Sequence, residues 1–155
     1  ILWFRKSSTD TLVRPSTTQD NITASGISVA CEVLIRLSVI TNNNKYKEIV
    51  ENQVKNASND IGRFPAAHCN WIKFLNIDNY SSQIVFTGKN FKSLLKTVNS
   101  EFLPYLTYGF DKGEKSFYIS KDKYVYGKNL AYFCKDYHCE LPVNSDEEVL
   151  NQIRT

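Results

Sequence analysis

Two cysteines near the end of the chain, Cys134 and Cys139, have a type and spacing that could do chemistry. Zinc-binding pairs usually enclose about two to four residues, and redox pairs usually follow a C-x-x-C pattern. His138 could be a third metal ligand, but it adjoins Cys139 and is poorly placed to share one ion. The open alternatives are half of a metal site, a redox pair, or two packed thiols at a strand end that could be bridged.

His68 and Cys69 form the second chemically suggestive pair. A cysteine–histidine dyad requires the two side chains to face each other, whereas neighbours on a helix point about 100° apart. The alternative role for His68 is a surface or capping residue. His68 therefore stands only as a weak catalytic candidate, although it could line a cavity in a larger protein.

Asp20, Ser25 and Ser28 form a polar cluster just before an apolar helix. A carboxylate beside hydroxyls could orient a sugar hydroxyl or a water, which makes Asp20 and Ser25 weak catalytic candidates. Glycoside cleavage would need a second carboxylate across the substrate, and Glu32 is the nearest option. The competing interpretation is that Ser25 or Ser28 caps the helix and that Asp20 is a loop residue.

The loop that begins at Gly88 invites comparison with a phosphate-binding turn, but one glycine between a strand and a helix favours an ordinary βα turn. We therefore expect no cofactor.

A net charge of +3 with scattered lysines argues against nucleic acid as a partner. The chain offers no apolar window long enough for a bilayer, so we expect no membrane partner and a cytoplasmic location. With four cysteines in a chain large enough to build a core, we expect reduced thiols.

The elements expected in the first half of the chain are mainly helical. Residues 1–14 have the pattern of a β-hairpin. An almost wholly apolar helix is expected from Ser25 to Ile40, where it should be buried on two sides, and an amphipathic helix from Lys45 to Asn56. A short polar turn between them predicts antiparallel packing. Phe64-Pro65 then opens a third helix.

The second half of the chain predicts a βαβ unit. A β-branched strand at 83–87, a helix at 91–101 and a strand at 103–109 indicate a parallel, right-handed crossover. The remaining elements are an edge strand or hairpin arm at 116–120, a turn or short strand at 124–127, a buried strand at 130–134, and a helix at 146–153. Ser145 and Glu148 form a capping box for that last helix. The predicted fold class is therefore mixed α and β, with a small sheet of three or four strands and flanking helices.

Several blocks of the sequence, in order, resemble a known family. They are Arg14-Pro15, Asp20-Asn21, Ala24-Ser25-Gly26, Ser28-Val29-Ala30, Phe64-Pro65-Ala66-Ala67-His68, Ile84-Val85-Phe86, Glu101-Phe102-Leu103-Pro104, and Ala131-Tyr132-Phe133-Cys134 with Cys139 and Pro142. Together they resemble the thioredoxin-domain-containing proteins of the spermatogenesis-associated, YyaL-like family. The chain departs from that pattern at Ile27, where asparagine is typical, and at Thr23-Ala24, where a proline is usual.

The resemblance implies an architecture more than an activity. Such proteins have a thioredoxin-like domain followed by an (α/α)6 toroid related to six-hairpin glycosidases and sugar epimerases. This chain would be their C-terminal portion, and its lack of methionine is consistent with an excised or processed piece. Residues 1–78 would end the toroid, and residues 79–155 would form a small α/β appendage.

Three roles follow as expectations. The first is a non-catalytic portion that completes the toroid, with the rest of the parent chain as its partner. The second is a contribution to a carbohydrate site through Asp20 and Ser25, and the third is a thiol accessory role for Cys134 and Cys139. Cut from its neighbours, such a fragment should expose apolar surface, so we expect it to self-associate.

Overall fold

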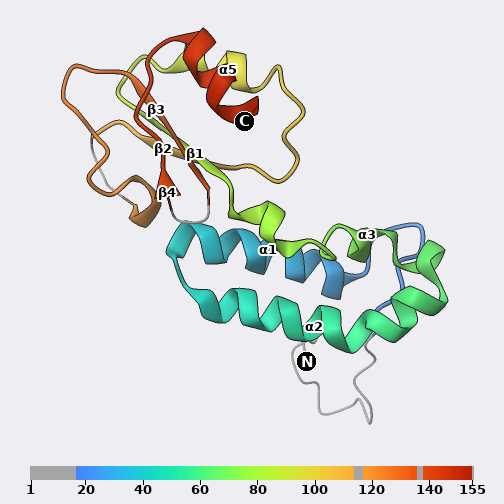
Figure 1. The fold of residues 1–155 in the computed structure, drawn as a ribbon. Coiled ribbons are helices and arrows are strands. Elements are labelled where there is room, and N and C mark those ends of the chain that lie inside the picture. The colour runs from blue at the N-terminus through green and yellow to red at the C-terminus, as the bar shows by residue number, and fades with distance from the viewer. Residues whose placement is uncertain (1–16, 114–116, 136–137, 155) are drawn as a thin grey trace. The chain divides into compact units, whose positions relative to one another are not determined.

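The computed structural model describes residues 17–113, 117–135 and 138–154 (Figure 1). The hairpin predicted at 1–14 lies outside these residues. The chain divides into two compact units. The helical unit comprises residues up to 38 together with 43–77, and the sheet unit comprises 39–42 together with 78–155. None of the described helices is both long and apolar enough to cross a membrane.

The helical unit is built on two antiparallel helices, α1 (Gly26–Thr41) and α2 (Asn44–Arg63) (Figure 1). Asn43 caps α2, because its side-chain oxygen accepts a hydrogen bond from the Lys45 backbone N–H at 3.2 Å. The buried residues of α2 recur at intervals of three and four positions, which places them on one face: Val50, Gln53, Ala57 and Ile61. The predicted pair of helices is confirmed, and α2 extends seven residues beyond the expected end at Asn56.

The third helix predicted after Phe64-Pro65 is replaced by two short pieces, a 3-10 turn η1 (Pro65–His68) and one turn of α-helix, α3 (Cys69–Ile72). The residue before a proline disfavours helical backbone, so α2 ends before Phe64 and the chain turns there. Trp71 is fully buried, and its indole N–H donates to the Thr18 carbonyl at 2.7 Å. This bond ties the loop before α1 to α3.

The sheet unit holds four strands in the order β2-β1-β3-β4 (Figure 1). Strands β1 (Gln83–Thr87) and β2 (Thr107–Asp111) are parallel, and β3 (Leu130–Lys135) pairs antiparallel with β1 and with β4 (His138–Cys139). The mixed fold class and the parallel crossover predicted from the sequence are therefore confirmed.

Two helices, α4 (Lys92–Val98) and α5 (Asp146–Arg154), pack on one core with the sheet. That core contains Ile84, Phe86, Phe91, Leu94, Val98, Leu106, Ala131 and Val149. The predicted capping box of α5 is present in part. Ser145 caps the helix, because its Oγ accepts from the Glu148 N–H at 3.3 Å, but the Glu148 carboxylate accepts from the Ser145 hydroxyl at 2.9 Å, which is not the backbone bond of a capping box.

Two predicted strands differ from the structure. Strand β2 begins at Thr107 rather than at Leu103, because residues 103–106 form a turn closed by the Leu106 N–H and the Leu103 carbonyl at 3.2 Å. The edge strand or hairpin arm predicted at 116–120 is wrong over its described part. Residues Tyr118–Ser120 form a 3-10 turn, η3, which Ser120 closes by accepting from the Phe117 N–H at 3.1 Å.

Candidate functional site

The polar cluster predicted around Asp20 is assembled in the helical unit. One carboxylate oxygen of Asp20 accepts from the Ser25 N–H at 2.7 Å and lies 3.1 Å from the Ser28 hydroxyl. The other oxygen accepts from the Asn70 N–H at 2.8 Å. The Asn70 side-chain amide donates to Ser28 Oγ at 2.8 Å. Asp20 thus joins the loop before α1, the first turn of α1 and α3.

The charge state of Asp20 follows from this geometry. Partial burial raises its pKa, but the hydrogen bonds from the Ser25 and Asn70 backbones and from the serine hydroxyls outweigh burial. They hold the pKa of the carboxyl below its usual value. Asp20 is therefore an ionised acceptor directed at groups of its own chain.

Ser25 has the geometry of a helix cap. It immediately precedes α1, and its hydroxyl oxygen accepts from the Ser28 N–H at 3.3 Å. Its carbonyl accepts from the Val29 N–H at 3.0 Å and lies 2.8 Å from the Ser28 hydroxyl, whose single proton is shared between this carbonyl and Asp20. The capping role weighed for Ser25 is the one that the structure displays, and Ser28 lies fully buried in the first turn.

His68 is fully buried, so the surface alternative is wrong, whereas its contact with the carbonyl of Phe64, the C-cap of α2, agrees with the capping alternative. Its Nδ1 lies 2.9 Å from the Phe64 carbonyl, which can only accept, so Nδ1 carries a proton. Its Nε2 lies 3.3 Å from the Thr18 hydroxyl. The exposed Cys69 sulfur instead lies near the Pro65 and Ala66 carbonyls, so His68 and Cys69 form no dyad.

Glu32 is engaged in ion pairs rather than directed at a substrate. It contacts Arg36 at 3.4 Å on α1 and pairs with Lys73 just after α3. Partial burial raises the pKa of Glu32, but the Lys73 and Arg36 charges outweigh burial and lower it. The structure thus does not bring Glu32 and Asp20 together as a catalytic carboxylate pair.

Cys134 and Cys139 form a disulfide between paired positions of β3 and β4, with their Cα atoms 3.9 Å apart. The expectation of four reduced thiols is therefore wrong for this pair. A disulfide sulfur is no thiolate ligand, and the described residues contain no group of three or more residues able to hold a metal. Cys31 is free and buried, and burial raises its pKa to about 11.

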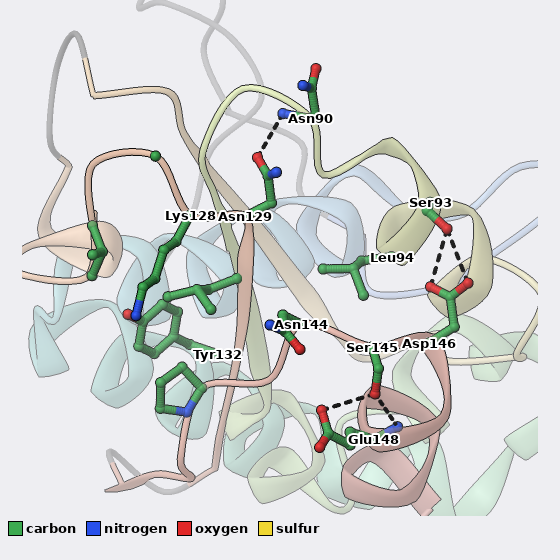
Figure 2. Close-up of a pocket in the computed structure, with 14 residues that line it drawn as sticks. Asn90, Ser93, Leu94, Lys128, Asn129, Tyr132, Asn144, Ser145, Asp146 and Glu148 are labelled. Carbon is green, nitrogen blue, oxygen red and sulfur yellow. Dashed lines mark hydrogen bonds between the residues drawn. The ribbon is translucent and has the colours of Figure 1, made fainter.

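The sheet unit contains a pocket of about 900 Å³ that the sequence analysis missed (Figure 2). Three segments line it: the start of α4, residues 125–132, and the turn that leads into α5. Two polar contacts join these segments. Asn129 Oδ1 accepts from the Asn90 N–H at 2.8 Å, and the Ser93 hydroxyl lies 3.0 Å from Asp146.

The lining side chains combine amides, one lysine, two carboxylates and an aromatic ring (Figure 2). Tyr132 is held by its hydroxyl, which donates to the Lys123 carbonyl at 2.7 Å, and burial raises its pKa. Asn144 is exposed and makes no side-chain hydrogen bond among the described residues. The only hint of this pocket in the sequence is that asparagines recur near Gly88, at Asn129 and at Asn144. No sequence pattern predicts that segments about 40 to 50 residues apart lie together.

Comparison of the chain with protein-family models, with curated proteins and with solved structures finds no match.

Proposed function

We propose that this chain is a non-catalytic, architectural part of a larger thioredoxin-domain-containing protein of the family it resembles. In that protein the helical unit would complete the α/α toroid, and the remainder of the parent chain would be its partner. The architectural role and the partner are both proposed on two grounds, the sequence resemblance and the helical hairpin formed by α1 and α2.

The polar cluster around Asp20 supports a structural role. Both carboxylate oxygens accept backbone N–H groups, one from Ser25 and one from Asn70. A carboxylate can accept further hydrogen bonds, but these two already direct both oxygens of Asp20 at backbone groups of its own chain. The cluster instead fixes the entry of α1, and this is why we place a carbohydrate role for Asp20 and Ser25 second to an architectural one.

The observation that supports this proposal most is an apolar side of α1 that the described residues of the helical unit leave exposed. Val29 and Val33 lie four positions apart, and therefore on one face, yet they are 45% and 53% exposed. A helix that is apolar around most of its surface is normally covered on more than one side. In the α/α toroid implied by the resemblance, each helical hairpin has neighbours, so another hairpin of the same protein is the proposed cover.

A double substitution tests this cover. Val29→Asp with Val33→Asp should destabilise the longer protein by about 2 kcal/mol or more, because two charges would be placed in a buried apolar contact. In the described part of the helical unit both positions are half exposed, so the midpoint of thermal unfolding of the chain alone should change little. Asn52→Asp, which adds one charge at an exposed position of α2, is the control. An unchanged unfolding midpoint in the longer protein would remove the proposal.

The disulfide favours a second candidate function, a thiol accessory role. Cys139 is exposed and Cys134 is fully buried, so an incoming thiolate would reach the Cys139 sulfur and release the Cys134 thiolate. The resemblance supplies a suitable donor, because it places a thioredoxin-like domain in the same protein. We also propose a cytoplasmic location, where disulfides of mesophilic proteins are usually transient.

Thiol counting tests the accessory role. Without reductant, one thiol of the native chain should react rapidly, the exposed Cys69, because Cys31 is buried with a raised pKa. After treatment with reduced thioredoxin under native conditions, Cys139 should become reactive as well. In the longer protein, Cys134→Ser with Cys139→Ser should alter reductase activity. Resistance of the bond to thioredoxin, together with an unchanged reductase activity, would rule this role out.

A further inference from the structure

The pocket of the sheet unit has walls that are braced before any ligand arrives. The Asn129 side chain is fixed against the Asn90 N–H, and Asp146 is joined to the Ser93 hydroxyl. The Tyr132 hydroxyl is held by the Lys123 carbonyl, so the ring has a defined position. A site whose side chains are fixed in advance spends less free energy on ordering them when it binds.

The chemistry of the lining narrows the class of ligand. Asp146 and Glu148 outnumber Lys128, so the lining disfavours an anion. Both carboxylates already contact serine hydroxyls, Ser93 for Asp146 and Ser145 for Glu148. The groups left to meet a ligand are mainly amides. Asn144 offers a donor and an acceptor side by side, whereas Asn129 offers chiefly its NH₂ group, because its oxygen accepts from the Asn90 N–H.

Two neighbouring sugar hydroxyls can hydrogen-bond to the donor and the acceptor of one side-chain amide. The C–H face of a pyranose ring can pack against an aromatic ring. We propose that this pocket binds a neutral sugar, with Asn144 and Asn129 on its hydroxyls and Tyr132 against its ring. Asn144, Tyr132 and Asp146 all line the pocket, and in the view of Figure 2 the Asn144 side chain is drawn between the other two. The volume of about 900 Å³ lies within the range of small-molecule sites. This inference concerns the sheet unit alone and does not depend on the role proposed for the helical unit.

Saturation-transfer NMR on the whole chain tests the site, with glucose, N-acetylglucosamine and maltose as probes at about 10 mM, suited to a Kd near 1 mM. We expect transfer to the ring protons of at least one sugar and amide shift changes at Asn129 and Asn144. Asn144→Ala should weaken binding about tenfold. Asn144 makes no side-chain bond in the described chain, so the fold should be kept. Asn99→Ala, at an exposed asparagine that does not line the pocket, should bind as the unaltered chain does.

Three results would overturn the proposal. They are no transfer to any of the sugars, equal transfer with Asn144→Ala, and displacement of the sugar by inorganic phosphate or glycine, which would assign the pocket to an anion or a zwitterion. Tyr132→Phe keeps the ring and removes only the hydroxyl bond to Lys123 that positions it, so it should weaken binding less than Tyr132→Ala, which removes the ring as well. Unchanged binding in Tyr132→Ala would contradict the assigned role of the ring.

Discussion

Replacement of Asp20 by asparagine should lower the free energy of unfolding of the helical unit by about 2 kcal/mol. Both carboxylate oxygens accept a backbone N–H, from Ser25 and from Asn70. An amide has one oxygen, so in either orientation its NH₂ group would face one of these N–H donors. Asp20→Ala, which removes every acceptor, should cost about 3 kcal/mol. Denaturant unfolding of the whole chain would measure both.

Asp60→Asn is the matched control, because Asp60 is exposed on α2 and its side chain makes no hydrogen bond in the described chain. It should leave stability almost unchanged. If the Asp20 and Asp60 variants unfolded alike, the cluster would not hold the helical unit together.

The same carboxyl should give a pH dependence. The folded-state pKa of Asp20 is lowered, so its contribution to stability is fully present above the unfolded value of about 3.9. That contribution is lost as the pH falls through the folded-state pKa. The stability difference between the unaltered chain and Asp20→Asn should therefore shrink below about pH 4. A difference that stayed constant on acidification would show that the carboxylate charge is not involved.

Gly88→Ala should have a large effect in the sheet unit, a loss of about 3 kcal/mol or more. Gly88 has φ +99°, a conformation that residues with a side chain rarely adopt. An added Cβ would also stand 2.3 Å from the Lys128 carbonyl oxygen and 2.5 Å from Asn129 Oδ1. The loop between β1 and α4 would have to move, and thermal unfolding of the whole chain would record the cost.

Gly127→Ala is the control that separates backbone strain at positive φ from the steric clash of the added Cβ. Gly127 also has a positive φ, +75°, but nothing lies within 4 Å of the position of its added Cβ. This control should cost about 1 kcal/mol, the strain of the backbone alone. Equal losses of stability in Gly88→Ala and Gly127→Ala would mean that the clash of the added Cβ with Lys128 and Asn129 does not contribute to the cost.

The elements that the sequence predicted well are those with local signals. The β-branched run at 83–87 ends at Gly88, and the capping residues Ser145 and Glu148 lie three positions apart, so neighbours in sequence determine both features. The predicted start of β2 is four residues too early, because Pro104 and Leu106 belong to a turn. The hydrogen bond that closes this turn cannot be predicted from hydrophobic periodicity. At η3, the Ser120 hydroxyl competes with strand pairing by bonding the Phe117 N–H.

The functional geometry depended on distant partners, and this is why it was predicted only in part. Asp20 and Ser25 were identified because they are close in sequence, whereas Asn70 is 50 positions from Asp20. The Cys134–Cys139 bond requires the short β4 to pair with β3, and the two-residue strand leaves no hydrophobic pattern. The pocket of the sheet unit is lined by three separate segments of the chain, so no single sequence motif predicts it.

The architectural role is tested most directly by measuring the same double substitution in two contexts. Val29→Asp with Val33→Asp should lower the unfolding midpoint of the longer protein by several degrees more than it lowers that of this chain alone, since about 1 kcal/mol corresponds to a few degrees. That excess would show that a neighbouring part of the protein covers α1. Equal shifts in the two contexts would contradict the account, because the exposed valines of α1 would then have no cover in the proposed longer protein.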